Sequence, residues 1–480
     1  MKRNQAKFIA CSMLALTVSV ATAKIELPEI ISDNAVLQQK SDAKLWGWSK
    51  PGSQVDVTTS WNGKTYTTKS DSNNGRWEVS VSTPEASFTP YSIEFKDADG
   101  AETISNVLIG EVWFCSGQSN MEMPLRGFGV QPIEGAAQAI AYSGKYPGIR
   151  MANIPKREAY TPQDKVVGKW NVSNPKNAGE FSALAYFFAQ SLTDLLNVPV
   201  GIINCAYGGS KVEGWIPKWK LDTYEGWDMA AEEKNKDMGN WERIGVMYNA
   251  MLKPVLGYTV KGFLWNQGES NVGRENEYPQ HQKDMVEIWR DEWGQGELPF
   301  YFVELPGWNY DNPEADNAAK FRECQHKAAE ILPNSGIVCT TDLVYPYEVP
   351  DIHARKKKEI GERLAFMAGA RTYGIEGIPH IYPSYKSVVL KGDTAVLTFN
   401  NAIGGLNPNT DLPGFEVAGE DQVFYPAKAT EDWNWPYTVT VSSDKVKDIK
   451  AVRYCFKNFA IGQLKDMYGL PLIPFRTDNW

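Results

Sequence analysis

A largely apolar run, Val107–Cys115, places the strongest constraint on the fold. It lacks the polar–apolar alternation of a half-exposed strand and is typical of a strand buried on both faces of a sheet. Similar runs recur at 198–207, 261–267, 298–305 and 335–343, and helical segments such as 181–196 lie between them. Strands that alternate with helices predict an α/β domain in which helices cover both faces of a mostly parallel sheet.

The sequence on either side of this region has a different pattern. From residue 24 to residue 105, polar and apolar side chains alternate with period two, and Asn62-Gly63 supplies a tight turn. Period two returns after residue 375, for example at Val439 and Val441. We therefore expect a central α/β domain over 106–375, flanked by β-sandwich-type regions over 24–105 and 376–480.

The first 23 residues have the features of a secretory signal peptide. Lys2, Arg3 and Lys7 precede an apolar run that ends at the small residues Ala21-Thr22-Ala23. This pattern predicts cleavage after residue 23 and a periplasmic or secreted protein. No later run reaches the roughly 18 apolar residues of a membrane span, so none is predicted.

Charge and cysteine content exclude several classes of function. The formal net charge is −9 and the basic residues do not cluster, which argues against nucleic acid as a partner. The six cysteines show neither C-x-x-C nor Cys/His ligand spacing, so we predict no zinc site. No feature of the sequence predicts an oligomeric state.

Polar loops follow three of the predicted strands, at the edge of the sheet where α/β domains bind ligands. The loop after Cys115 contains Ser119, whose hydroxyl could act as a nucleophile beside the N–H groups of a starting helix. Gly208-Gly209 allow a substrate oxygen to approach the backbone closely, and 265–271 crowds amide and carboxylate groups into one loop. The alternative for Ser119 is a helix N-cap.

Histidine is scarce, which narrows the search for a general base. Of four histidines, His281 and His326 fall within predicted helices as surface or packing residues, and His380 lies near a domain boundary. His353 precedes a helix predicted from about 354 to 371, whose N-terminus would disfavour the protonated imidazole. We predict acyl transfer, in which His353 deprotonates Ser119 and backbone N–H groups of Ser119 and Gly209 bind the oxyanion. The alternative is a histidine that caps a surface helix.

At these residues the chain resembles the sialate O-acetylesterase family of the SGNH hydrolase superfamily, which is related to the acetylxylan esterases. The resemblance extends over nearly the whole chain after residue 23. It implies a three-layer, flavodoxin-like α/β domain and a serine esterase that removes O-acetyl groups from sugars without metal or cofactor. The segments that carry it, in order, are VLIGEVWFCSGQSNMEMPL, GIINCAYGGSKVEGWIP, YNAMLKP, WNQGESN, FRECQH and DIHARKKKEIGERLA.

The resemblance assigns roles to individual residues. It makes Ser119 the nucleophile, His353 the base and Gly209 an oxyanion donor. The acid that orients the histidine usually lies three residues before it, where this chain has Pro350, whereas Asp351 lies two before. Asp351, Asp342, Glu269 or a backbone carbonyl could therefore orient His353. The other candidates for binding oxyanion or substrate are Gln118, Asn120, Gln267 and Glu269.

The features that would select a substrate are weaker. Arg126 could bind a sugar carboxylate or form a surface ion pair, and Trp308 and Tyr310 could stack on a sugar or pack locally. The segment 218–243 is predicted to form a lid or rim. The leading hypothesis is hydrolysis of 9-O-acetylated sialic acid, free or in a glycan. The alternatives are deacetylation of xylan or another polysaccharide, and a non-catalytic glycan-binding protein.

Overall fold

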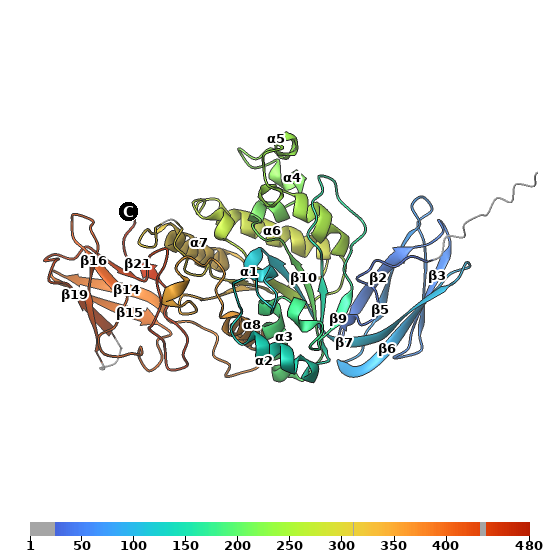
Figure 1. Ribbon diagram of the computed structural model, residues 1–480, viewed down its shortest axis with the longest axis horizontal. Helices are drawn as coiled ribbons and strands as arrows, with labels where there is room; N and C mark the ends of the chain where they lie inside the picture. Colours follow the sequence, from blue (N-terminus) through green and yellow to red (C-terminus); the bar gives the residue numbers. More distant parts are fainter. Residues whose placement is uncertain (1–24, 311, 433–437) are drawn as a thin grey trace, which may run out of the picture.

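The computed structural model describes residues 25–310, 312–432 and 438–480. The chain forms an elongated molecule with a central α/β region between two β regions (Figure 1). The segment predicted to be a signal peptide lies outside the described residues. Within the described part, no helix is long and apolar enough to cross a membrane.

The central sheet has the strand order β13-β12-β11-β7-β10-β8-β9. Its neighbours pair in parallel, except that β9 runs antiparallel to β8 at the edge. The predicted α/β domain with a mostly parallel sheet is confirmed. The strands are β7 (Ala101–Gly117), β8 (Ile149–Asn153), β9 (Trp170–Val172), β10 (Val200–Ala206), β11 (Gly262–Asn266), β12 (Phe300–Val303) and β13 (Ser335–Val338).

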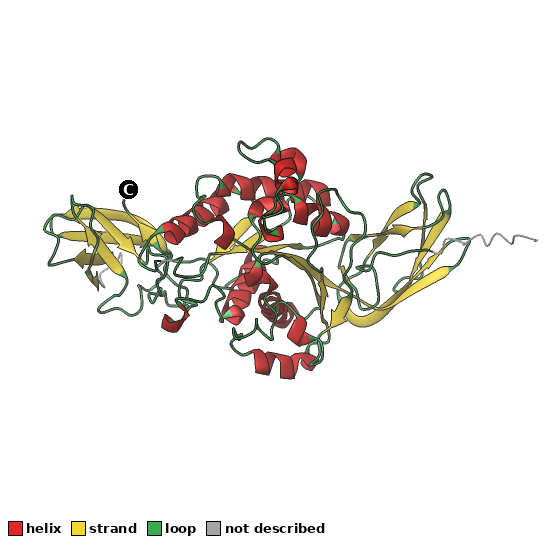
Figure 2. Ribbon diagram, turned by 45° about the horizontal axis from the view of Figure 1, so that its top comes forward, coloured by secondary structure: helices red, strands yellow, loops and turns green. Residues whose placement is uncertain are grey.

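Helices cover both faces of this sheet (Figures 1 and 2). On one face α3 packs against α8. The two helices can approach closely because Gly361 has no side chain, and a Cβ there would lie only 2.7 Å from the backbone nitrogen of Phe188. The Ser182 hydroxyl caps α3 by accepting a hydrogen bond from the N–H of Ala185. The main helices are α2 (Ala136–Tyr142), α3 (Ala183–Leu196) and α8 (Lys357–Arg371) on one face, and α6 (Tyr278–Trp293) and α7 (Asn317–Ile331) on the other.

The N-terminal β region is continuous with the central sheet. The first half of β7 pairs with β6 and β1, and residues 111–117 of the same strand pair with β10 and β11. The boundary expected between residues 105 and 106 therefore falls inside one strand. The other strands are β1 (Val36–Gln38), β2 (Asp42–Trp48), β3 (Gln54–Thr59), β4 (Thr65–Lys69), β5 (Arg76–Ser82) and β6 (Ser87–Lys96).

The C-terminal region packs two antiparallel sheets, β14-β15-β19-β18 and β17-β16-β20-β21, around a shared apolar core. It is tied to the central domain at α7, where the Asn458 side chain accepts from the N–H of Ala318 and Arg476 pairs with Glu323. The strands are β14 (Ser384–Lys391), β15 (Thr394–Asn400), β16 (Phe415–Ala418), β17 (Tyr425–Pro426), β18 (Lys428–Asp432), β19 (Thr438–Ser442), β20 (Ala451–Tyr454) and β21 (Phe475–Arg476).

Candidate active site

Ser119 is the first residue of the short helix α1 (Ser119–Glu122), directly after the buried end of β7. The turn requires Gly117, which has φ +135° and whose added Cβ would lie 2.1 Å from the carbonyl oxygen of Asn266. Ser119 is half-buried, and within the described residues its hydroxyl has no hydrogen-bond partner. The strand end therefore presents a hydroxyl that is free to react.

The loop that carries His353 meets the Ser119 loop. The Asn120 amide donates to the carbonyl of Ile352 at 3.1 Å, which joins the residue after Ser119 to the residue before His353. The Phe128 ring packs edge-on against the imidazole, with ring centroids 5.4 Å apart. Two loops that lie far apart in the sequence are thus in contact through Asn120 and Ile352.

Helix α8 begins at Lys357, so His353 does not lie at its N-terminus. The expected helix start near residue 354 is wrong, because residues 351–356 are irregular and the helix begins at Lys357. Burial lowers the pKa of His353 below 6.5, and the Lys357 ammonium lowers it further, against the opposing effect of Asp351 and Glu122. The histidine is kept neutral by burial and a neighbouring cation rather than by a helix dipole.

The imidazole is oriented by a residue that the sequence did not single out, Gln131. Its side-chain oxygen contacts His353 Nδ1 at 2.8 Å, and its Nε2 donates to Asp351 Oδ1 at 2.7 Å. Because a carboxylate only accepts, the amide must direct its oxygen toward the imidazole, which places the proton on Nδ1. His353 Nε2 is then a hydrogen-bond acceptor, and it is buried without a partner among the described residues.

The other candidates for the orienting group are engaged elsewhere. Asp342 forms a two-pronged ion pair with Arg363, both contacts at 2.7 Å, and a further one with Lys465 at 2.8 Å. Glu269 accepts from the Asn120 amide. Asp351 also accepts from the backbone N–H of His353 at 3.1 Å. Of the three carboxylates proposed from the sequence, only Asp351 is linked to the imidazole, and it is linked through Gln131.

Asp342 is therefore expected to matter for stability. Asp342→Ala should lower the free energy of unfolding by about 3–5 kcal/mol, because it leaves the buried Arg363 guanidinium unpaired. Chemical denaturation measures the change. The matched control is Asp444→Ala, since Asp444 pairs with Lys428 at the exposed surface and should have no measurable effect. Equal stability of both variants would contradict the prediction.

Gly208 and Gly209 lie against the nucleophile loop. The Gly208 N–H donates to Glu122 Oε2 at 2.7 Å, and a Cβ on Gly208 would be 3.4 Å from the Cβ of Ser119. Gly209 has φ +82°, and its backbone N–H and that of Ser119 make no hydrogen bond within the described residues. Two free N–H groups beside a free hydroxyl can bind an oxyanion.

The remaining polar residues bind the three loops together. Gln118 accepts from the N–H of Gly268 at 3.3 Å. Gln267 Nε2 donates to the carbonyl of Ser210 at 3.0 Å and to Asn271 Oδ1 at 2.7 Å, so both of its protons have acceptors. No donor within the described residues reaches its buried Oε1. Gln267 therefore holds the 267–271 loop against the 207–210 loop.

Asn120 bridges two buried charged groups. Its amide donates to Glu269, and its oxygen accepts from the Lys357 ammonium. Burial raises the pKa of Glu269 and lowers the pKa of Lys357 to about 8. The attraction between the two charges opposes both shifts. The cation is close enough to His353 to affect its titration.

The pH dependence of activity should reflect this environment. We expect kcat/KM to fall on acidification with a midpoint below pH 6.5, because the base must be neutral and its pKa is lowered by burial and Lys357. Lys357→Met should move this acidic limb to higher pH. Lys358→Met, which removes an exposed ammonium from the next position, should leave the limb unchanged. A pH–rate profile with an unmoved limb in Lys357→Met would contradict this electrostatic effect.

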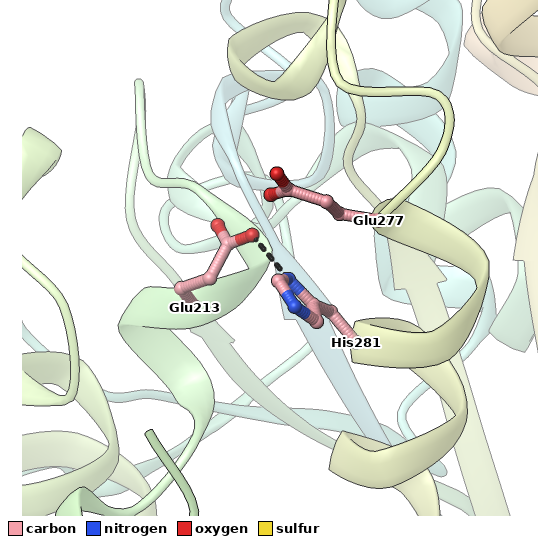
Figure 3. A group of neighbouring side chains, drawn as sticks. All are labelled: Glu213, Glu277 and His281. Atoms are coloured by element: carbon pink, nitrogen blue, oxygen red, sulfur yellow. Dashed lines mark hydrogen bonds and ion pairs between the residues drawn. The ribbon is translucent and has the colours of Figure 1, made fainter. Parts of the chain in front are cut away.

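Glu213 and His281 form a buried pair (Figure 3). His281 Nδ1 contacts Glu213 Oε1 at 2.7 Å, and Glu213 also accepts from Asn271, the residue that holds Gln267. The His281 ring stacks on Tyr224 at 4.1 Å, so His281 is a satisfied packing residue, as expected. Glu277 is near enough for the three to reach a common metal ion, but Glu213 is already committed to these hydrogen bonds.

The predicted substrate-binding residues have local partners. Arg126 pairs with Glu180 at 2.7 Å, and both are exposed at the edge of a pocket of about 260 Å³ that Glu122 and Phe128 also line. Trp308 and Tyr310 pack on each other with ring centroids 4.5 Å apart. Arg126 thus forms the surface ion pair that was the alternative to binding a sugar carboxylate.

Comparison with known proteins identifies the family. The model of the family "Carbohydrate esterase, sialic acid-specific acetylesterase" matches residues 109–368. A carbohydrate acetylesterase from Xanthomonas citri has 33% sequence identity and a TM-score of 0.84, covering 95% of this chain and all of its own. Sialate O-acetylesterase from Homo sapiens is 26% identical over 411 residues (76% of this chain and 75% of the human protein), and that from Mus musculus is 26% identical over 427 residues (76% and 77%). The chain therefore belongs to the sialic acid-specific acetylesterase family of carbohydrate esterases, and it is a carboxylic ester hydrolase.

Proposed function

We propose that the protein is a serine esterase of the SGNH type that removes O-acetyl groups from carbohydrates, with 9-O-acetylated sialic acid as the leading substrate. The observation that carries the proposal is the buried Nε2 of His353, which has no hydrogen-bond partner among the described residues. Gln131 orients this imidazole through Nδ1, and its loop contacts the loop of Ser119. An imidazole with its proton on Nδ1 has an Nε2 that can accept a proton, which supports His353 as the general base.

The reaction follows from these groups. Ser119 Oγ attacks the acetyl carbonyl while His353 Nε2 accepts its proton, and the backbone N–H groups of Ser119 and Gly209 bind the tetrahedral oxyanion. His353 then returns the proton to the departing sugar hydroxyl, which leaves an acetyl-Ser119 intermediate. Water then attacks the ester carbonyl while His353 Nε2 accepts its proton, and His353 returns this proton to Ser119 Oγ as the Oγ–acyl bond breaks and acetate leaves.

The substrate is tested by comparing acetate release from O-acetylated mucin and from acetylated xylan. The human and mouse relatives are called sialate O-acetylesterases, and the Xanthomonas relative a carbohydrate acetylesterase, so the relatives favour a sugar ester and rank sialic acid first. We expect faster release from mucin. Faster release from xylan would establish the polysaccharide alternative, and release from neither would leave the glycan-binding alternative.

We also propose that the protein is exported to the periplasm or the medium. The proposal rests on the basic residues, apolar run and Ala21-Thr22-Ala23 site at the start of the chain. Cell fractionation and N-terminal sequencing of the mature protein test it. A mature N-terminus other than residue 24, or a cytosolic protein, would overturn it.

A further inference from the structure

The segment 218–243 forms a rim that is held in shape by its own contacts. It contains α4 (Lys218–Leu221), α5 (Met229–Lys234) and the short turn η4 (Asn240–Glu242), and α4 and α5 project above α6 (Figure 1). The Arg243 guanidinium donates to the carbonyls of Glu232 at 2.7 Å and Asn235 at 2.9 Å, which closes the segment on itself. The rim is thus an ordered structure rather than an open loop.

Trp241 lies on this rim, directly over the glycine loop beside Ser119. A Cβ on Gly209 would be 2.9 Å from the Trp241 Cδ1, and a Cβ on Gly239 would be 2.6 Å from its Cζ2. The two edges of the indole therefore rest on two glycines, and a side chain at either position would displace the ring. The Glu242 carboxylate accepts from the Gly239 N–H at 2.9 Å, which fixes the turn around the ring.

The position of Trp241 places an aromatic surface next to the reacting groups. Although it packs on Gly209, Trp241 is 50% exposed. Gly209 supplies a free N–H beside Ser119, and Gly208 lies against the Ser119 side chain. An exposed aromatic ring that packs on Gly209 lies where a sugar bound beside Ser119 would meet it, and indole rings supply a large apolar contact area.

We infer that Trp241 is a stacking platform for the pyranose ring whose acetyl group is cleaved at Ser119, an inference that rests on the proposed function. A pyranose has an apolar face of C–H groups and a polar rim of hydroxyls. The indole covers the C–H face, while the hydroxyls stay in water or meet the polar loops. Because the indole already packs against Gly209 and Gly239, its side chain loses little conformational entropy when a sugar binds, and this favours affinity.

The experiment compares Trp241→Ala with a matched control, Trp219→Ala. Trp219 lies on α4 of the same segment and is 62% exposed, but no glycine of the site contacts it. For each variant, kcat/KM is measured with the better acetylated glycan and with p-nitrophenyl acetate, which has no pyranose. Trp241→Ala should lower the glycan-to-nitrophenyl ratio about five- to tenfold. Trp241→Phe should recover part of it, and Trp219→Ala should leave it unchanged.

A binding measurement tests the role of Trp241 independently of the proposed chemistry. In a Ser119→Ala background, calorimetry with the deacetylated sugar should show about five- to tenfold weaker binding when Trp241 is also replaced by Ala. Equal loss of both ester activities in Trp241→Ala, with unchanged sugar binding, would overturn the platform. Full activity of Ser119→Ala would instead overturn the mechanism and leave the binding result standing.

Discussion

Ser119→Ala is expected to abolish hydrolysis of p-nitrophenyl acetate, with a loss in kcat of about 10³-fold or more. The hydroxyl is the only group proposed to receive the acetyl group, and the oxyanion-binding N–H groups that remain give weak catalysis alone. Because Ser119 Oγ has no hydrogen-bond partner within the described residues, its removal should leave the melting temperature nearly unchanged. The esterase assay and a thermal melt measure the two effects.

His353→Ala tests whether the two residues act together. If Ser119 and His353 form one catalytic unit, each single variant should lose about as much activity as the double variant. Losses that multiply would show that the residues act independently. A Ser119→Ala variant with full activity would contradict the acetyl-serine mechanism altogether.

The sequence predicts the central strands well, because a strand that is buried on both faces is an almost continuous run of apolar residues. It fails at the boundary near residue 105. From Ala101 to Asn106 only Ile104 is buried, whereas from Val107 to Gly117 every residue is buried. The change of pattern at Val107 marks a change in what surrounds the strand, from one covered face to two, and the strand itself continues.

Some residues of the candidate site can be predicted from the neighbouring sequence, and others depend on contacts between distant segments. Ser119 and Gly209 follow apolar runs, so their positions at strand ends could be predicted from neighbouring residues. Gln131 lies in an irregular loop, 222 positions from His353, and no local pattern distinguishes it. Its role depends on how loop 128–131 packs against loop 351–353, which only the tertiary structure reveals.

Asp351→Asn is expected to lower kcat by about 10²-fold or more through the tautomer of His353. An asparagine amide at position 351 can donate to Gln131, which then rotates and turns its own NH₂ toward His353 Nδ1. The proton moves to Nε2, and the nitrogen that must accept from Ser119 becomes a donor. The His353 backbone N–H donates to the same Oδ1 as Gln131 does, so an asparagine at position 351 that turns its NH₂ toward Gln131 also loses this contact.

Gln131→Leu separates this effect from loss of loop shape. Leucine has a similar size but cannot hydrogen-bond to Asp351 or to His353, so the imidazole loses the group that orients it. We expect a loss in kcat of about 10–100-fold. If Asp351 acts through Gln131, adding Asp351→Asn to Gln131→Leu should cost little more, and the double-mutant cycle will show strong coupling. Additive losses would mean that Asp351 acts through the backbone N–H of His353 instead. The pair of variants thus decides whether this esterase orients its base through an amide that links the carboxylate to the imidazole.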